Sequence, residues 1–280
     1  MRELGYVVCD VFTDRPLTGN QLAVFTNGTG LDVDTMQALA REMAFSETVF
    51  VWPATEGGHA RIRIFTPVSE IPFAGHPTLG SAFVIGTTVQ LDELRLETGR
   101  GIVPVRLQRE GARVVFGWMS QPIPSVTPFT KAEALLSALG LQGSELPIEL
   151  YDNGPTHTQV VVSRREELTT LSPDYHALAA VDVDTTSVVA GSGREVESRV
   201  FAPRARIAED AATGSAAGPL ALHLVRHGRL GFGEELTITQ GLALHRPACL
   251  HARIRGTAGA IESVEVGGSA VVVARGKFRI

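Results

Sequence analysis

Cysteine is scarce in this sequence of 280 residues, the net charge is small, and long hydrophobic runs are absent. Two cysteines, Cys9 and Cys249, give no disulfide framework, so we expect a reducing, cytoplasmic environment. The net charge is −5 and there is no basic block, which makes nucleic acid an unexpected partner. No apolar run approaches the ~20 residues of a membrane-spanning helix, so we expect no membrane partner.

What the sequence does contain is enough apolar material for a core. Hydrophobic residues make up 44% and charged residues 20%, a composition typical of a globular protein. The first residues, "MRELGYVVCDVF", are typical of a strand. They lack the long apolar stretch and the small-residue cleavage site of a signal peptide, so we do not expect one here. The length allows one large domain or two of roughly 140 residues.

Many short β-type runs are separated by 29 glycines and 15 prolines, and four longer segments have helical patterns. Residues 32–45 begin with an Asp cap, and residues 130–140 begin with Thr and end with Gly. Residues 76–86 and 215–228 are apolar nearly all round, so we expect both helices to be buried. The most linker-like region is 120–130, with three prolines in eleven residues.

The two halves of the sequence repeat each other in three places, at offsets of 136 to 139 residues. Chance explains any one match, but three in register indicate a duplicated unit. We expect one half over 1–124, joined by a C-terminal strand at 267–280, and the other over 125–266. The matches are RIFTP at 63–67 with RVFAP at 199–203, QLAVF at 21–25 with QVVVS at 159–163, and Gly75 with Gly214, which begin the two buried helices.

Each half then has a buried helix that begins at a glycine. The first turn of a helix carries unpaired N–H groups and partial positive charge, which favours an anion. Small residues allow a ligand to approach these donors, so the two turns indicate a site for a small carboxylate. A second interpretation is that Ala and Gly merely let the helices pack tightly.

Several polar residues lie beside these turns. Glu209 and Asp210 precede the second turn, where capping the helix would account for one acid. His76 directly follows Gly75 and is a candidate for chemistry or a structural residue next to Pro77.

The segment "FSETVFV" supplies a third candidate, Glu47, which follows Ser46 at the start of an apolar strand. Glu47 could simply face solvent at the strand edge. In a closed pocket, however, desolvation would raise its pKa and suit it to general acid–base work.

The sequence gives little support for a zinc protease, a two-thiol racemase or the common nucleotide-binding and hydrolase motifs. In "HLVRH", His223 and His227 have i,i+4 spacing, but leucine stands where a zinc protease needs glutamate, so we interpret the pair as helix packing. No cysteine lies near either glycine turn, which removes a two-thiol racemase mechanism. There is no dinucleotide fingerprint, P-loop or nucleophile elbow.

Taken together, the motifs resemble the PhzF family over nearly the whole chain. They are "DVFTDRPLTGNQLAVF", "FSETVFV", "RIFTPVSEIPFAGHPTLG", "MSQPIP", "PIELYDNGP" and "EDAATGSAAGPLALHL". The resemblance implies an α+β, diaminopimelate epimerase-like fold with two pseudo-symmetric halves. Each half would be a curved, mostly antiparallel sheet around a central helix, with substrate bound between the halves of each subunit of a homodimer.

The resemblance also implies an isomerase of phenazine biosynthesis that needs no cofactor and no metal. Its substrate would be trans-2,3-dihydro-3-hydroxyanthranilate, with Glu47 taking a proton from C3 of the ring and returning it at C1. The implied catalytic residues are Glu47, His76 and Asp210, and the implied substrate-binding residues are Ser46, Gly75, Thr213, Gly214 and Ser215.

Two departures from the family pattern keep the substrate open. Gln21 stands where the family usually has proline, and His245 stands where a glycine is typical. An isomerase or epimerase of another small cyclic or amino acid therefore remains an alternative, as does a non-catalytic metabolite-binding protein.

Overall fold

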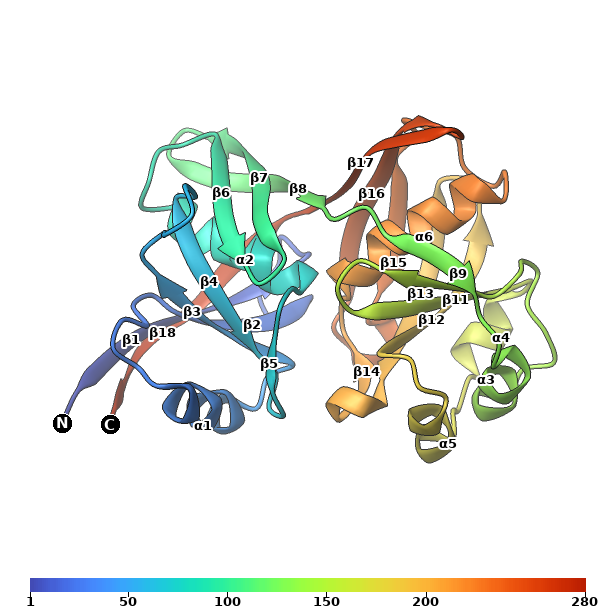
Figure 1. The fold of residues 1–280 in the computed structure, drawn as a ribbon, viewed down its shortest axis with the longest axis horizontal. Coiled ribbons are helices and arrows are strands. Elements are labelled where there is room, and N and C mark those ends of the chain that lie inside the picture. Colours follow the sequence, from blue (N-terminus) through green and yellow to red (C-terminus); the bar gives the residue numbers. More distant parts are fainter. The chain divides into compact units, whose positions relative to one another are not determined.

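The computed structural model describes all residues from Met1 to Ile280. They form two compact units, drawn in Figure 1. Unit 1 comprises Met1–Ser120 and Gly267–Ile280, and unit 2 comprises Gln121–Val266. No helix combines the length and apolar character needed to cross a membrane.

Unit 1 is built on one sheet with the strand order β18-β1-β2-β3-β4-β6-β7-β8, and the short β5 pairs with β4. The β2–β3 and β4–β6 pairs are parallel and the others are antiparallel. The bounds are β1 Glu3–Val11, β2 Asn20–Phe25, β3 Glu47–Trp52, β4 Ala60–Phe65, β5 Glu70–Ile71, β6 Glu93–Thr98, β7 Gly101–Glu110, β8 Arg113–Gln121 and β18 Ala270–Arg279.

Helix α2 (Gly75–Gly86) is the centre of unit 1, and every residue in it except Ile85 is buried. A Cβ at Gly80 would lie 2.6 Å from the Leu22 side chain, so only glycine permits this close packing on the sheet. The predicted burial of this helix is therefore confirmed.

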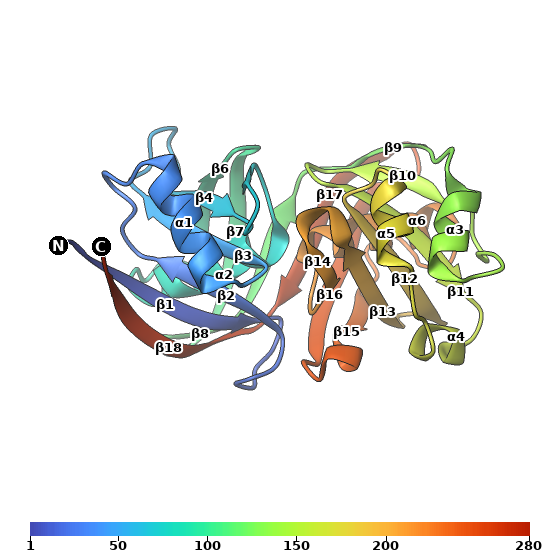
Figure 2. The same cartoon turned by 90° about the horizontal axis from the view of Figure 1, so that it is seen from below.

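Helix α1 (Val33–Met43) covers the other face of the sheet (Figure 2). The Asp32 side chain caps it by accepting a hydrogen bond from the Thr35 N–H at 2.7 Å, as the sequence predicts. Its buried residues pack with the phenylalanines at positions 25, 50 and 65.

Unit 2 has the strand order β9-β10-β11-β12-β13-β15-β16, and β14 pairs with β13. Ion pairs from Arg253 and Arg255 to Glu265 link β16 to β17. The strands are β9 Ser125–Pro128, β10 Glu149–Asp152, β11 Thr156–Val162, β12 Thr185–Ser192, β13 Glu195–Ala202, β14 Ile207–Asp210, β15 Leu236–Gln240, β16 Ala248–Thr257 and β17 Ala260–Gly268.

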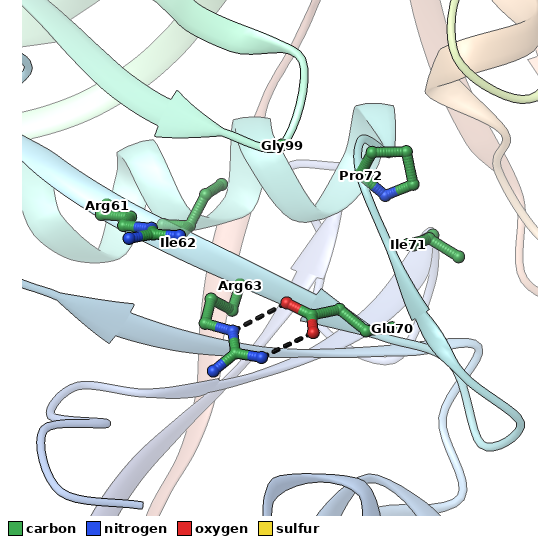
Figure 3. A pocket seen from close by; sticks show the side chains of 7 residues that line it. All are labelled: Arg61, Ile62, Arg63, Glu70, Ile71, Pro72 and Gly99. Atoms are coloured by element: carbon green, nitrogen blue, oxygen red, sulfur yellow. Dashed lines mark hydrogen bonds and ion pairs between the residues drawn. The ribbon is translucent and has the colours of Figure 1, made fainter. Parts of the chain in front are cut away.

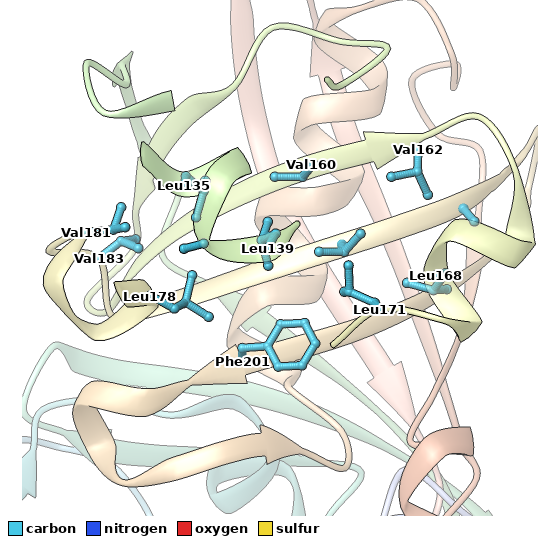
Figure 4. Close-up of a cluster of buried hydrophobic side chains, with 13 residues drawn as sticks. Leu135, Leu139, Val160, Val162, Leu168, Leu171, Leu178, Val181, Val183 and Phe201 are labelled. Atoms are coloured by element: carbon cyan, nitrogen blue, oxygen red, sulfur yellow. The ribbon is translucent and has the colours of Figure 1, made fainter. Parts of the chain in front are cut away.

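The central helix of unit 2 is α6 (Gly214–Arg226), of which all but Arg226 is buried. Three short helices, α3 (Ala132–Leu139), α4 (Arg165–Thr169) and α5 (Tyr175–Ala180), cover the outer face of the sheet. Figure 4 shows the apolar core beneath them, which includes Leu135, Val160 and Phe201. Two 3₁₀ turns, Pro203–Ala205 and Leu242–Leu244, complete the unit.

The pairing pattern of unit 1 is repeated in unit 2. In both units an antiparallel run is followed by a parallel pair, an antiparallel pair with a short hairpin strand, and a second parallel pair. The sequence repeats lie on matching elements: β2 with β11, β4 with β13, and α2 with α6. The predicted α+β fold with two pseudo-symmetric halves is confirmed.

Two local expectations need correction. The linker-like region 120–130 contains β9, which pairs with β10, and its last residue is Pro128. Proline at a strand end sacrifices no interior hydrogen bond, which is why the prolines there do not prevent a strand. Thr130 does not cap α3, which begins at Ala132, although Gly140 ends that helix in the left-handed conformation as expected.

Candidate active site

Glu47 and His76 lie side by side in unit 1. Glu47 is the first residue of β3, and His76 lies in the first turn of α2. Glu47 Oε2 is 3.4 Å from His76 Nε2, and the two side chains are only 13% and 3% exposed. Glu47 therefore does not extend into bulk solvent at the strand edge but contacts the start of the central helix.

Asn20 joins Ser46 to the same group. Ser46 Oγ donates a hydrogen bond to Asn20 Oδ1 at 3.2 Å, and Asn20 Nδ2 lies 3.3 Å from His76 Nδ1. The sequence reasoning missed Asn20, although it belongs to the quoted motif "GNQLAVF" at the start of β2. Asn20 holds together two predicted site residues that come from different elements.

Burial keeps the His76 imidazole neutral near neutral pH. Desolvation lowers the pKa of His76 to about 3, and a backbone hydrogen bond with Gln21 opposes this only in part. A neutral imidazole has one N–H donor and one acceptor nitrogen. It can therefore orient a carboxylate or a substrate hydroxyl without introducing a second charge.

In unit 2, Asp210 is the last residue of β14 and Thr213 directly precedes α6. Thr213 Oγ1 donates to Asp210 Oδ2 at 2.6 Å. Gln240, which we did not predict as a site residue, donates to the Asp210 carbonyl at 2.9 Å and accepts from the Thr213 N–H at 3.1 Å. Thr213 thus binds the Asp210 carboxylate, and the Gln240 side chain from β15 holds the backbone of Asp210 and Thr213 at the helix entry.

The first carbonyl groups of α6 are bound by two further side chains that we did not predict as site residues. Pro219 lies inside the helix and has no N–H, so the carbonyl of Ser215 loses its usual i+4 donor. Asn153 Nδ2 donates to that carbonyl at 2.9 Å, and Gln121 Nε2 donates to the Gly214 carbonyl at 2.8 Å. Both residues belong to quoted motifs, "PIELYDNGP" and "MSQPIP", but nothing local links them to the helix.

Neither central helix is capped by its own preceding side chain. The residues before Gly75 and Gly214, Ala74 and Thr213, make no side-chain capping hydrogen bond. First-turn N–H groups have no partner within the helix. The expected backbone donors at Gly75, Gly214 and Ser215 are therefore placed at helix entries, as the sequence predicts, and remain candidates for binding a carboxylate.

Glu209 is separate from this group because it forms an ion pair with Arg199. Arg199 binds both carboxylate oxygens, at 3.1 and 2.7 Å. The matching pair in unit 1 is Arg63 with Glu70, at 2.7 and 2.6 Å. The arginines are the first residues of the repeated RIFTP and RVFAP motifs. Each unit therefore has an ion pair that joins the two strands of the hairpin before its central helix.

A pocket of about 290 Å³ lies on unit 1 (Figure 3). Figure 3 shows the Arg63–Glu70 ion pair in its wall. The remaining lining residues are Arg61, Ile62, Ile71, Pro72 and Gly99. None of the predicted site residues lines this pocket, so its size does not mark it as the reaction site.

Residues 9–276 match the family model PhzC-PhzF, "Phenazine biosynthesis-like protein". The chain is 46% identical to the trans-2,3-dihydro-3-hydroxyanthranilate isomerase of Pseudomonas aeruginosa, over 97% of this chain and 98% of that protein.

Solved structures agree on the fold. A PhzF-family phenazine biosynthesis protein from Bacillus anthracis has a TM-score of 0.87 at 23% identity, covering all of both chains. A hydroxyproline epimerase from Agrobacterium vitis has a TM-score of 0.68 at 11% identity, covering 99% of this chain and 91% of that one. These similarities extend over nearly the whole of each chain although the sequence identities are low, so the chain has the diaminopimelate epimerase-like fold.

The protein therefore belongs to the class of α+β proteins with the epimerase-like fold, which is built from two similar halves. Within it the chain belongs to the PhzF family, as an isomerase of that family.

Proposed function

We propose that this protein isomerises trans-2,3-dihydro-3-hydroxyanthranilate, with Glu47 as the acid and base. The observation that carries the proposal is the contact between the largely buried Glu47 carboxylate and the buried His76 ring at the entry of α2. Support for the substrate is the 46% identity, over nearly the full length, to a protein of that name.

The proposed reaction is a redox-neutral proton shift. The Glu47 carboxylate takes the proton from C3, the ring double bonds shift, and the same carboxyl group returns the proton at C1. The resulting enol tautomerises to an aminoketone. General acid–base catalysis of this kind typically contributes about 10²–10⁴ in rate.

The other residues would bind and orient the substrate. His76 and Asp210 assist in binding and proton placement, and donors at Gly75, Gly214 and Ser215 hold the substrate carboxylate, with Ser46 and Thr213 beside them. Fixed donors are typically worth about 3–4 kcal/mol each in such reactions. We further propose that the protein works as a cytoplasmic homodimer, which its family resemblance implies.

Glu47→Gln tests the assigned base. Because glutamine keeps the shape but cannot accept the proton, we expect kcat on dihydrohydroxyanthranilate to fall at least about 10²-fold. Glu47→Asp should retain part of the activity, and Glu42→Gln, an exposed change on α1, should have none of this effect. Near-wild-type turnover by Glu47→Gln would reject the role of this carboxylate.

A related substrate is the second candidate, because His245 stands where a glycine is typical of the family. His245 adopts a left-handed φ of 55°, a conformation suited to the glycine typical of the family. Incubation of candidate cyclic and amino acids in D₂O would identify such a substrate by its site of deuterium uptake. Exchange into another acid, with none into dihydrohydroxyanthranilate, would favour this second candidate.

A further inference from the structure

The C-terminal end of α6 carries a cluster that the proposed reaction does not use. His223 lies in the last turn of the helix and His227 directly follows it. The HLVRH pattern lacks a glutamate within the helix, but the fold supplies one from elsewhere: Glu149, the first residue of β10. The interpretation of these histidines as helix packing is therefore incomplete.

The three side chains converge through their ligand atoms. Glu149 Oε2 is 3.0 Å from His227 Nε2 and 3.6 Å from His223 Nδ1, and all three atoms lie within 4.8 Å of one another. Zinc bonds of about 2.0–2.2 Å in a tetrahedron place neighbouring ligand atoms about 3.4 Å apart. Small side-chain movements would bring this set to that geometry.

The residues around this Glu149–His223–His227 cluster also contact Glu149. The hydroxyl of the fully buried Tyr151 lies 2.8 Å from Glu149 Oε2 and 2.9 Å from His223 Nδ1. Arg226 binds the other oxygen, Oε1, at 3.0 Å and so leaves Oε2 to the remaining groups. The carbonyls at the end of a helix also favour a cation.

Access to the cluster comes from the side of His227. Its side chain is 21% exposed, whereas His223 is fully buried. His223 lies nine residues after Gly214, about 13 Å along the helix axis at 1.5 Å per residue. A bound ion here would connect β10 to the end of α6 and would take no part at the helix entry.

We propose that Glu149, His223 and His227 bind one divalent transition-metal ion of the zinc class. Two imidazole nitrogens select such ions over Mg²⁺ and Ca²⁺, which prefer oxygen ligands. A water occupies the fourth position, and the Tyr151 hydroxyl donates to Glu149 as an outer-sphere partner. On binding, each imidazole places its remaining proton on the ring nitrogen that does not face the metal.

The test is calorimetric titration of the full chain, after dialysis against a chelator, with Zn²⁺ and with Mg²⁺. We expect one Zn²⁺ per chain, a higher melting temperature with zinc, and no comparable effect of Mg²⁺. His227→Asn and Glu149→Gln should each weaken zinc binding at least about tenfold. Since neither residue belongs to the proposed reaction site, this result is independent of the reaction.

His251→Asn is the matched control. His251 Nδ1 lies 2.9 Å from Glu235 Oε1, and His251 Nε2 lies 3.4 Å from the Cys249 sulfur. These three side chains are therefore another group in unit 2 that zinc could contact. This variant should bind zinc as the wild type does.

Cobalt(II) offers a readout that does not depend on stability. Its visible absorption should show a tetrahedral site in the wild type and lose it in folded His227→Asn. Absence of zinc binding by the folded wild type would overturn the proposal and leave the cluster as a hydrogen-bonded link. Zinc binding that survives in His227→Asn but disappears in His251→Asn would overturn it as well.

Discussion

Pro219 imposes a defect on α6 that one distant side chain corrects. It removes the N–H that would reach the Ser215 carbonyl, and Asn153 supplies the missing donor from a position 62 residues away in the chain. Asn20 serves unit 1 in a similar way by joining Ser46 and His76. At the scale of single residues, both helix entries thus depend on asparagines from other parts of their units.

Asn153→Ala should cost about 1–3 kcal/mol of stability, because it leaves a buried carbonyl without its donor. In a Pro219→Ala background, residue 219 regains an N–H that can reach Ser215, so the same change should cost less. Urea unfolding of the four proteins in this double-mutant cycle measures the difference. Equal costs in the two backgrounds would refute the role we assign to Asn153.

At the scale of elements, the repeated hairpins before the central helices carry the same ion pair in different surroundings. In unit 2 the side chains of Arg199 and Glu209 are 12% and 6% exposed, and Arg199 also donates to the carbonyls of Leu168 and Leu171. In unit 1, Glu70 is 37% exposed beside Arg63. Both arginines lie over a phenylalanine ring two residues later in the chain.

These surroundings predict unequal costs for one chemical change. Glu209→Gln should destabilise the protein by about 3 kcal/mol, because it leaves a nearly buried guanidinium without its counter-charge. Glu70→Gln should cost less than about 1 kcal/mol, since water screens the exposed pair. Chemical denaturation of both variants is the measurement, and a larger loss for Glu70→Gln would contradict the comparison.

The elements themselves were largely predictable from the sequence. An Asp cap with helical apolar spacing predicts α1, and start and stop signals predict α3. Segments that are apolar nearly all round predict α2 and α6, and ten short β-type runs of the sequence coincide with strands. The short helices α4 and α5 were missed, since five or six residues are too few to show a helical period. Strand β12 was also missed, because its sequence "TTSVVAGS" begins with polar residues although six of its eight residues are buried.

At the scale of the whole molecule, buried histidines predict sensitivity to mild acid. Burial lowers the pKa of His76 to about 3 and that of His157 to about 4, where the charges of Asp184 and Asp152 oppose the shift. An unfolded histidine titrates near 6.5. Below about pH 6.5 the unfolded chain therefore binds protons that the folded chain does not, and stability falls as the pH falls.

We expect each buried histidine to contribute a slope of up to about 1.4 kcal/mol per pH unit between roughly pH 6.5 and pH 5. Most carboxylates titrate at lower pH, so this window isolates the histidines. Unfolding free energies from urea titrations at several pH values measure the slope. His76→Gln should reduce it, and an unchanged slope in that variant would show that His76 is not one of the groups responsible.

Ten of the strands, the two central helices, the duplicated halves and the candidates Glu47, His76 and Asp210 could be inferred from the sequence alone. These follow from local causes: apolar periodicity, turn-forming glycine and proline, and repeated motifs. Which side chains meet becomes apparent only in the folded chain. Asn20 contacts His76 across 56 residues and Glu149 contacts His227 across 78. Such pairings depend on how strands and helices pack, because local periodicity places a residue on a face of its element but does not select its partner.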